Sequence, residues 1–177
     1  MQDRRPPLRA RRLAALIGLA TALVIPTSPA LAVSSAYSMS GFEIYAGVYE
    51  GVFVGTATGN RREVATWKAD ILHTPLSEGS PNSVITGGYA KVITSDLTVL
   101  RGDFAPGGTV VLENRVEPCG NETFRVEGTL VDVTRDDDPS AVGTATFAGT
   151  LTHHRRSFFG YCVSYAASFK GEMGLTF

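Results

Sequence analysis

The chain has 177 residues and carries 16 basic residues (Lys and Arg) against 17 acidic residues (Asp and Glu). Its length suits one domain with a sizeable core. After the apolar run that ends at Ile25, no stretch approaches the roughly 20 apolar residues that a membrane-spanning helix needs, which excludes a helical membrane anchor in the processed chain.

We interpret the first 32 residues as a cleaved export signal. A basic stretch from Arg4 to Arg12 leads into an apolar run over residues 13–25, and Ala30-Leu31-Ala32 then matches a signal-peptidase site. We therefore expect cleavage after Ala32 and a secreted or otherwise extracytoplasmic protein of bacterial origin. The pair Arg11-Arg12 leaves a twin-arginine signal open, but its plain Ala and Leu neighbours favour the general secretory route.

Processing would change the charge of the chain. It removes five arginines and Asp3, which leaves 11 basic and 16 acidic residues in the expected domain, residues 33–177, and a formal charge near −5. A mildly acidic protein has no general electrostatic reason to hold nucleic acid, because that binding requires Lys and Arg to neutralise phosphates.

Two cysteines, Cys119 and Cys162, lie in the processed part of the chain. An exported protein meets an oxidising compartment, where an even cysteine count usually indicates a disulfide. Only one pairing exists, so we predict a Cys119–Cys162 bond.

Alternation of apolar and polar residues with period two recurs along the chain, which is typical of half-buried strands. The segments that show it, in chain order, are 42–49, 51–58, 63–73, 84–94, 97–104, 110–117, 124–130, 144–152 and 161–177. The five prolines beyond residue 32 all fall between these segments, where a missing backbone donor does no harm. We predict an all-β, single-domain antiparallel barrel of about eight strands, with a two-sheet sandwich as the alternative.

The last segment alternates most strictly, with Phe169, Met173, Leu175 and Phe177 on one face. This ending resembles the closing strand of bacterial outer-membrane barrels, whose apolar faces meet lipid. The other segments favour a soluble barrel, because small residues dilute their apolar faces in the way that a tapering interior requires. On that interpretation the odd-numbered face from Tyr161 to Phe177 turns inward and the even-numbered face with Cys162 turns outward.

Aromatic residues lie on the apolar faces of three segments. They are candidates for lining a ligand cavity in the barrel mouth, with plain core packing as the alternative. These candidates are Trp67, Phe147, Tyr161, Tyr165 and Phe169.

The basic stretch from His153 to Arg156 combines two histidines with two arginines. The two adjacent histidines point to opposite faces of an extended chain, so they cannot easily share a metal. We interpret the stretch as a solvated hairpin tip, with an anion site at Arg155 and Arg156 as the weaker alternative. Asp136, Asp137 and Asp138 lack the alternating spacing of a calcium loop and are interpreted as a solvated turn.

No catalytic motif stands out in the sequence: the nucleophile elbow G-x-S-x-G, H-E-x-x-H and C-x-x-C are all missing. Glu43, Tyr45, Tyr49 and Tyr89 are ambiguous in facing and leave open a single buried acid or base. We therefore expect no metal and no cofactor, and we assign no catalytic residue.

Three functional hypotheses follow. The leading one is a secreted, soluble, disulfide-linked barrel that binds an apolar small molecule or a protein partner without catalysis. The second is a barrel cyclase or isomerase that uses one buried acid or base. The third is a small eight-stranded outer-membrane barrel. Strand count and glycine-rich alternation resemble those of lipocalin-like and dirigent-like barrels, but no motif of either family is present, so no site is carried over.

Overall fold

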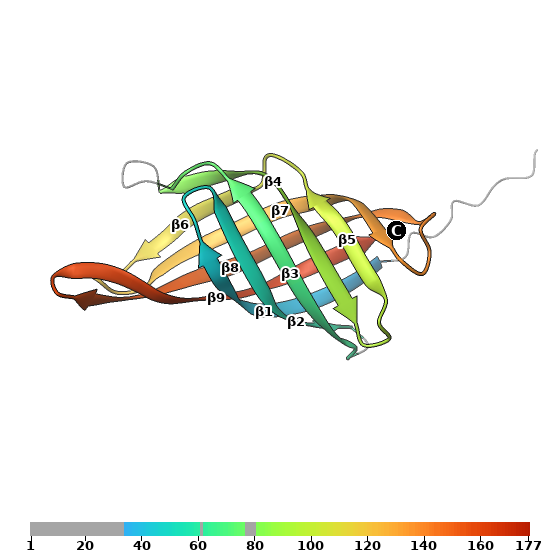
Figure 1. The fold of residues 1–177 in the computed structure, drawn as a ribbon, viewed down its shortest axis with the longest axis horizontal. Helices are drawn as coiled ribbons and strands as arrows, with labels where there is room; N and C mark the ends of the chain where they lie inside the picture. The colour runs from blue at the N-terminus through green and yellow to red at the C-terminus, as the bar shows by residue number, and fades with distance from the viewer. Residues whose placement is uncertain (1–33, 61, 77–80) are drawn as a thin grey trace, which may run out of the picture. The chain divides into compact units, whose positions relative to one another are not determined.

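The computed structural model describes residues 34–60, 62–76 and 81–177; the expected export signal lies outside the described residues. The described part is all-β and confirms the predicted class (Figure 1). Its strands are β1 (Ser34–Ala46), β2 (Glu50–Gly59), β3 (Val64–His73), β4 (Asn82–Thr94), β5 (Val99–Phe104), β6 (Thr109–Arg115), β7 (Glu122–Arg135), β8 (Val142–Phe158) and β9 (Tyr161–Thr176). Among these residues there is no helix that could cross a membrane.

Hydrogen bonding closes the sheet into an antiparallel ring of eight strands in the order β1-β2-β3-β4-β5-β7-β8-β9, with β9 returning to β1. The ninth strand, β6, pairs with the first residues of β4 and β7, whereas β5 pairs with their later residues. Strands β5 and β6 therefore both lie between β4 and β7, one after the other along the barrel wall, and the turn at residues 105–108 connects them. Ring closure leaves no free sheet edge around the barrel wall.

Interior side chains alternate between large and very small residues, as the taper of a closed barrel requires. The Trp67 ring lies against the backbone of Gly41 and Gly55: a methyl group added at those glycines would come within 2.6 and 2.7 Å of it. Phe147 covers Gly128 in the same way, at 2.5 Å. Glycine inside these strands thus gives each ring its space, which is the close approach that interior glycine signals.

The outward positions of the barrel wall are mostly polar or small. On β8 they are Thr144, Thr146, Ala148 and Thr150, and all four are exposed. Lys170 and Glu172 of β9 also point outward and are exposed. The barrel parts of β8 and β9 therefore have a buried apolar face and a solvated polar one, as the alternation predicts, whereas β1 turns Phe42 and Ile44 outward, at 64% and 61% exposed.

The last two strands extend beyond their neighbours. Pairing of β7 with β8 ends at His153, and pairing of β1 with β9 ends at Ser168. Residues 154–166 consequently pair only with one another and form a two-stranded arm, here called the projecting hairpin (Figure 1). The barrel interior ends where this hairpin begins.

Candidate functional site

The barrel interior is filled by its own side chains. Three of the five predicted lining residues, Trp67, Phe147 and Phe169, are buried in one continuous core. They border an internal cavity of only about 40 Å³, whereas ligand pockets typically have 300–1,000 Å³. Phe169 makes edge-on contacts with Trp67, at 5.7 Å between ring centroids, and with Phe53, at 6.3 Å. These rings pack as core, and the interior has no room for an apolar ligand of ordinary size.

The other two predicted lining residues lie elsewhere. Tyr161 and Tyr165 are 76% and 61% exposed on the projecting hairpin, so the five candidates do not share one lining. The prediction that the whole odd-numbered face of the last strand turns inward is correct from Ala167 to Leu175 and wrong for Tyr161 to Tyr165. The physical reason is that β1 and β7 end before this part of β9, so no wall encloses it.

A two-residue turn forms the tip of the projecting hairpin. Phe158 pairs with Tyr161, and between them Phe159 and Gly160 both have positive φ, at 48° and 82°. This is the turn geometry whose twist matches paired strands, and it normally selects Asn-Gly. Placing a phenylalanine there costs conformational energy, because left-handed φ disfavours a bulky side chain. The tip therefore carries an aromatic ring at a position where this turn type favours asparagine.

The projecting hairpin is fastened to its neighbours near its tip, where Cys162 pairs with Ser157 next to the turn, and nearer its base, at Arg155. Cys119 and Cys162 form the predicted disulfide, with their Cα atoms 5.5 Å apart. Glu122 of β7 pairs with Arg155 of the hairpin and with Arg115 of β6, the latter at 2.8 Å. A covalent bond and an ion-pair network thus hold the arm in one orientation.

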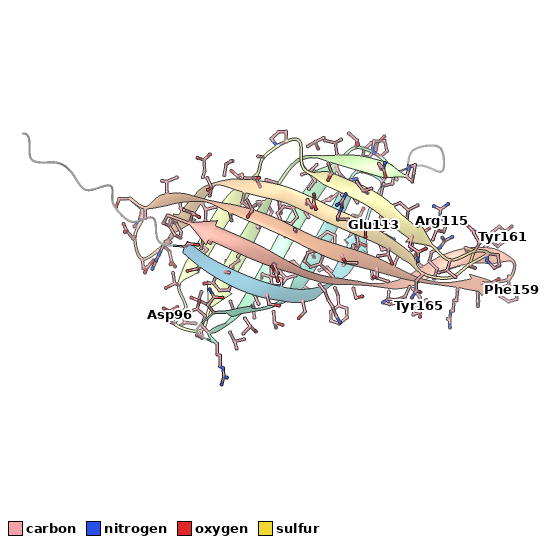
Figure 2. All side chains as sticks on the ribbon, turned by 180° about the vertical axis from the view of Figure 1, so that it is seen from behind. Asp96, Glu113, Arg115, Phe159, Tyr161 and Tyr165 are labelled. Atoms are coloured by element: carbon pink, nitrogen blue, oxygen red, sulfur yellow. A yellow bond between two sulfur atoms is a disulfide. The ribbon has the colours of Figure 1, made fainter. Side chains whose placement is uncertain are left out.

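Aromatic side chains cover the projecting hairpin (Figure 2). Phe159 is 87% exposed and Phe158 is 55% exposed, and their rings contact each other edge-on at 4.5 Å between centroids. The guanidinium of Arg156 lies over the Tyr165 ring, 5.4 Å from its centroid. Exposed aromatics beside arginine form the combination that is enriched where proteins bind other proteins.

The basic stretch from His153 to Arg156 is not the hairpin tip that the sequence analysis expected. It belongs to β8, which continues to Phe158. The two histidines do point to opposite faces, as predicted. His154 bonds to the Ser168 hydroxyl at 3.1 Å, while His153 turns inward. Arg155 is occupied by Glu122 and Arg156 by the Tyr165 ring, so the two arginines form no common anion site.

One buried acid–base pair lies at the hairpin end of the interior. The Nε2 atom of His153 is 2.8 Å from the Oε2 atom of Glu43, whose side chain is 6% exposed. These residues sit on β8 and β1, with β9 between them. Of the four residues that were ambiguous in facing, Glu43 is thus the buried one, and Tyr45, Tyr49 and Tyr89 are exposed.

Other polar candidates have ordinary structural partners. Asp136 accepts a hydrogen bond from the Val99 amide at 2.8 Å, Asp137 pairs with Arg135, and Asp138 bonds to the Ser140 hydroxyl. Within the described residues no three His, Cys, Asp or Glu side chains come together as metal ligands.

Sequence reasoning did not find Phe158 and Phe159 as site residues. The available signal was the run Ser157-Phe-Phe-Gly160: Gly160 marks a turn, and two phenylalanines beside a turn are unusual on a solvated surface.

No protein-family model, curated protein or solved structure matches this chain.

Proposed function

We propose that this chain is an exported, non-catalytic binding protein that recognises a protein partner through the aromatic side chains of its projecting hairpin. The observation that carries the proposal is the exposure of Phe158, Phe159, Tyr161 and Tyr165 on an arm fixed by a disulfide. A monomeric protein rarely exposes such a contiguous apolar surface without using it.

Rigidity of the hairpin supports binding of a protein. Ordering side chains and loops at an interface costs roughly 0.5–1.5 kcal/mol for each immobilised side chain, and pre-organisation lowers that cost. The Cys119–Cys162 bond and the Arg155–Glu122 pair already order the arm before any partner arrives. Among the described strands none pairs with either outer edge of the hairpin, so a partner strand can add backbone hydrogen bonds there.

The filled interior favours a protein partner over an apolar small molecule, because the apolar cavity beside Trp67 and Phe169 measures only about 40 Å³. The polar outward face of β8 favours a soluble barrel over one in a membrane, since lipid would require an apolar band there. Expected export is consistent with the Cys119–Cys162 bond, because disulfides persist in oxidising compartments.

Site-specific photo-crosslinking in the producing culture tests the proposal. A benzophenone analogue of phenylalanine replaces Phe159 in one variant, Tyr165 in a second, and the outward mid-barrel residue Thr150 in a third as control. We expect one discrete adduct with another protein from positions 159 and 165 and none from 150. Absence of an adduct from both hairpin positions, or an identical adduct from Thr150, would contradict the proposal.

A second candidate function, a barrel enzyme with one buried acid or base, is favoured by the Glu43–His153 pair. A carboxylate hydrogen-bonded to an imidazole can orient it and stabilise its protonated form. The test is turnover of a small-molecule panel by the purified protein. Activity that Glu43→Gln abolishes while the circular dichroism spectrum is unchanged would replace the binding proposal with this one.

A further inference from the structure

At the barrel end away from the projecting hairpin, a cavity of about 360 Å³ lies over the core; we call it the vestibule. Its walls come from the start of β1, the β2–β3 and β4–β5 turns, the end of β7 and the C-terminal residues. Figure 2 places Asp96, one of the wall residues, at this end and Phe159 at the other. The volume falls in the range of small-molecule sites.

Two carboxylates face the vestibule, Asp96 and Glu63, and neither forms a salt bridge with a described side chain. Asp96 accepts hydrogen bonds from the Thr98 amide, at 3.3 Å, and from the Thr94 hydroxyl, both uncharged donors. Glu63 accepts one from the phenol of Tyr37, a residue only 5% exposed.

The one described cation of the vestibule wall, Arg135, is engaged by a carboxylate outside the cavity. Arg135 donates two hydrogen bonds to Asp137, at 2.9 and 2.6 Å, and this pairing raises the pKa of its guanidinium. The Arg135 guanidinium is therefore bound to the carboxylate of Asp137, which does not line the cavity. Among the described wall residues, the two carboxylates of Asp96 and Glu63 therefore outnumber the single guanidinium of Arg135.

Glu63, Asp96 and Arg135 all influence the pKa of the Tyr37 phenol, which lines the same cavity. Burial first, and then the hydrogen bond and charge of Glu63, raise the pKa of the Tyr37 phenol to about 12. Asp96 acts in the same direction and Arg135 in the opposite one. Tyr37 therefore stays protonated at neutral pH and donates its phenol hydrogen bond to Glu63.

The vestibule also has an apolar floor. Leu100 and Leu175 belong to the buried core, and Phe177 packs against that core from the C-terminal end. A ligand in this cavity would thus meet carboxylates and hydroxyl groups at the wall and aliphatic and aromatic carbon below.

We propose that the vestibule binds a small organic cation, an amine with a compact apolar part. Its ammonium group lies between the carboxylates of Asp96 and Glu63, and its apolar part rests on Leu175 and Phe177. This site is at the opposite end of the barrel from the projecting hairpin and does not depend on the function proposed for that hairpin.

Three probes of one shape test the proposal by ¹⁵N-resolved NMR titration of the chain from residue 33. Phenethylamine is the cation, 2-phenylethanol its neutral analogue and phenylacetate an anionic one. We expect phenethylamine to bind in the millimolar range, as a ligand of this size should, and to shift the amide signals of Glu63, of residues 94–98 and of Leu175 to Phe177. The other two probes should leave these signals in place.

Variants with matched shape assign the interaction. Asp96→Asn keeps an oxygen that can accept from Thr94 and Thr98 but removes the charge, so phenethylamine should bind about tenfold more weakly. Glu113→Gln, on exposed β6 toward the hairpin end, is the control and should not change binding. Absence of vestibule shifts with phenethylamine, equal binding of 2-phenylethanol, or unchanged affinity in Asp96→Asn would each overturn the proposal.

Discussion

Removal of the Cys119–Cys162 bond should lower the free energy of unfolding substantially. The bond joins residues 43 apart, and the chain-entropy relation gives about 13 cal/mol/K for a loop of that length, or about 4 kcal/mol at 25 °C. Typical domains are stable by only about 5–15 kcal/mol, so this is a large part of the total. The double variant Cys119→Ser/Cys162→Ser removes the bond without leaving a free thiol.

Urea unfolding of the oxidised wild type and the double variant measures this effect through the transition midpoint. Hydrogen exchange then locates it. Amides of residues 154–166 should exchange faster in the variant, because the hairpin has lost its covalent attachment, whereas those of residues 144–151 inside the barrel wall should be protected in both proteins. Equal midpoints would refute the entropic reasoning, and unchanged exchange in the hairpin would refute the claim that the bond orders it.

Three further predictions concern the barrel itself. Gly55→Ala should destabilise by about 1–3 kcal/mol because its methyl group would strike the Trp67 ring; a neutral substitution would show that the ring is free to move. Phe147→Ala should cost about 3–5 kcal/mol by calorimetry, and a loss below 1 kcal/mol would mean that the interior is not close-packed there. Tyr37, with its pKa raised to about 12, stabilises the fold fully below pH 10 and loses this contribution, about 2–3 kcal/mol, as pH rises to 12. The wild type should therefore lose more stability than Tyr37→Phe over that interval, and parallel curves would contradict the assignment.

Local alternation predicted most strands and the inward face of β3, but it failed at the end of β1, where Glu43 is buried and Phe42 and Ile44 are exposed. Ala65, Trp67, Ala69 and Ile71 alternate with polar residues in the sequence, and all four are buried in the barrel. The prolines lie between the segments and so indicated where one strand ends and the next begins. The barrel class followed because many short strands in series must close or expose two edges.

The alternation within one strand does not show which neighbouring strands enclose its apolar face. Tyr161 and Tyr165 alternate just as Phe169 does, yet they lie where β1 and β7 have ended. The extent of those neighbours is set by register between distant segments, which a single strand does not encode.

Contacts between residues far apart in sequence were equally out of reach. Glu43 and His153 are 110 residues apart, and the sequence suggested a solvated position for the histidine. The vestibule joins Glu63 and Asp96 from two different connections with Arg135 from the end of β7, and only ring closure brings them together.

Affinity for the crosslinked partner tests the central claim about the projecting hairpin most directly. Phe159→Asn is the decisive variant, because asparagine favours the positive φ of this turn while removing the exposed ring. We predict a Kd at least about tenfold higher than that of the wild type, as expected for loss of an aromatic anchor, with an equal or higher melting temperature. A Kd equal to that of the wild type in the folded variant would contradict the claim that the hairpin aromatics carry the interaction.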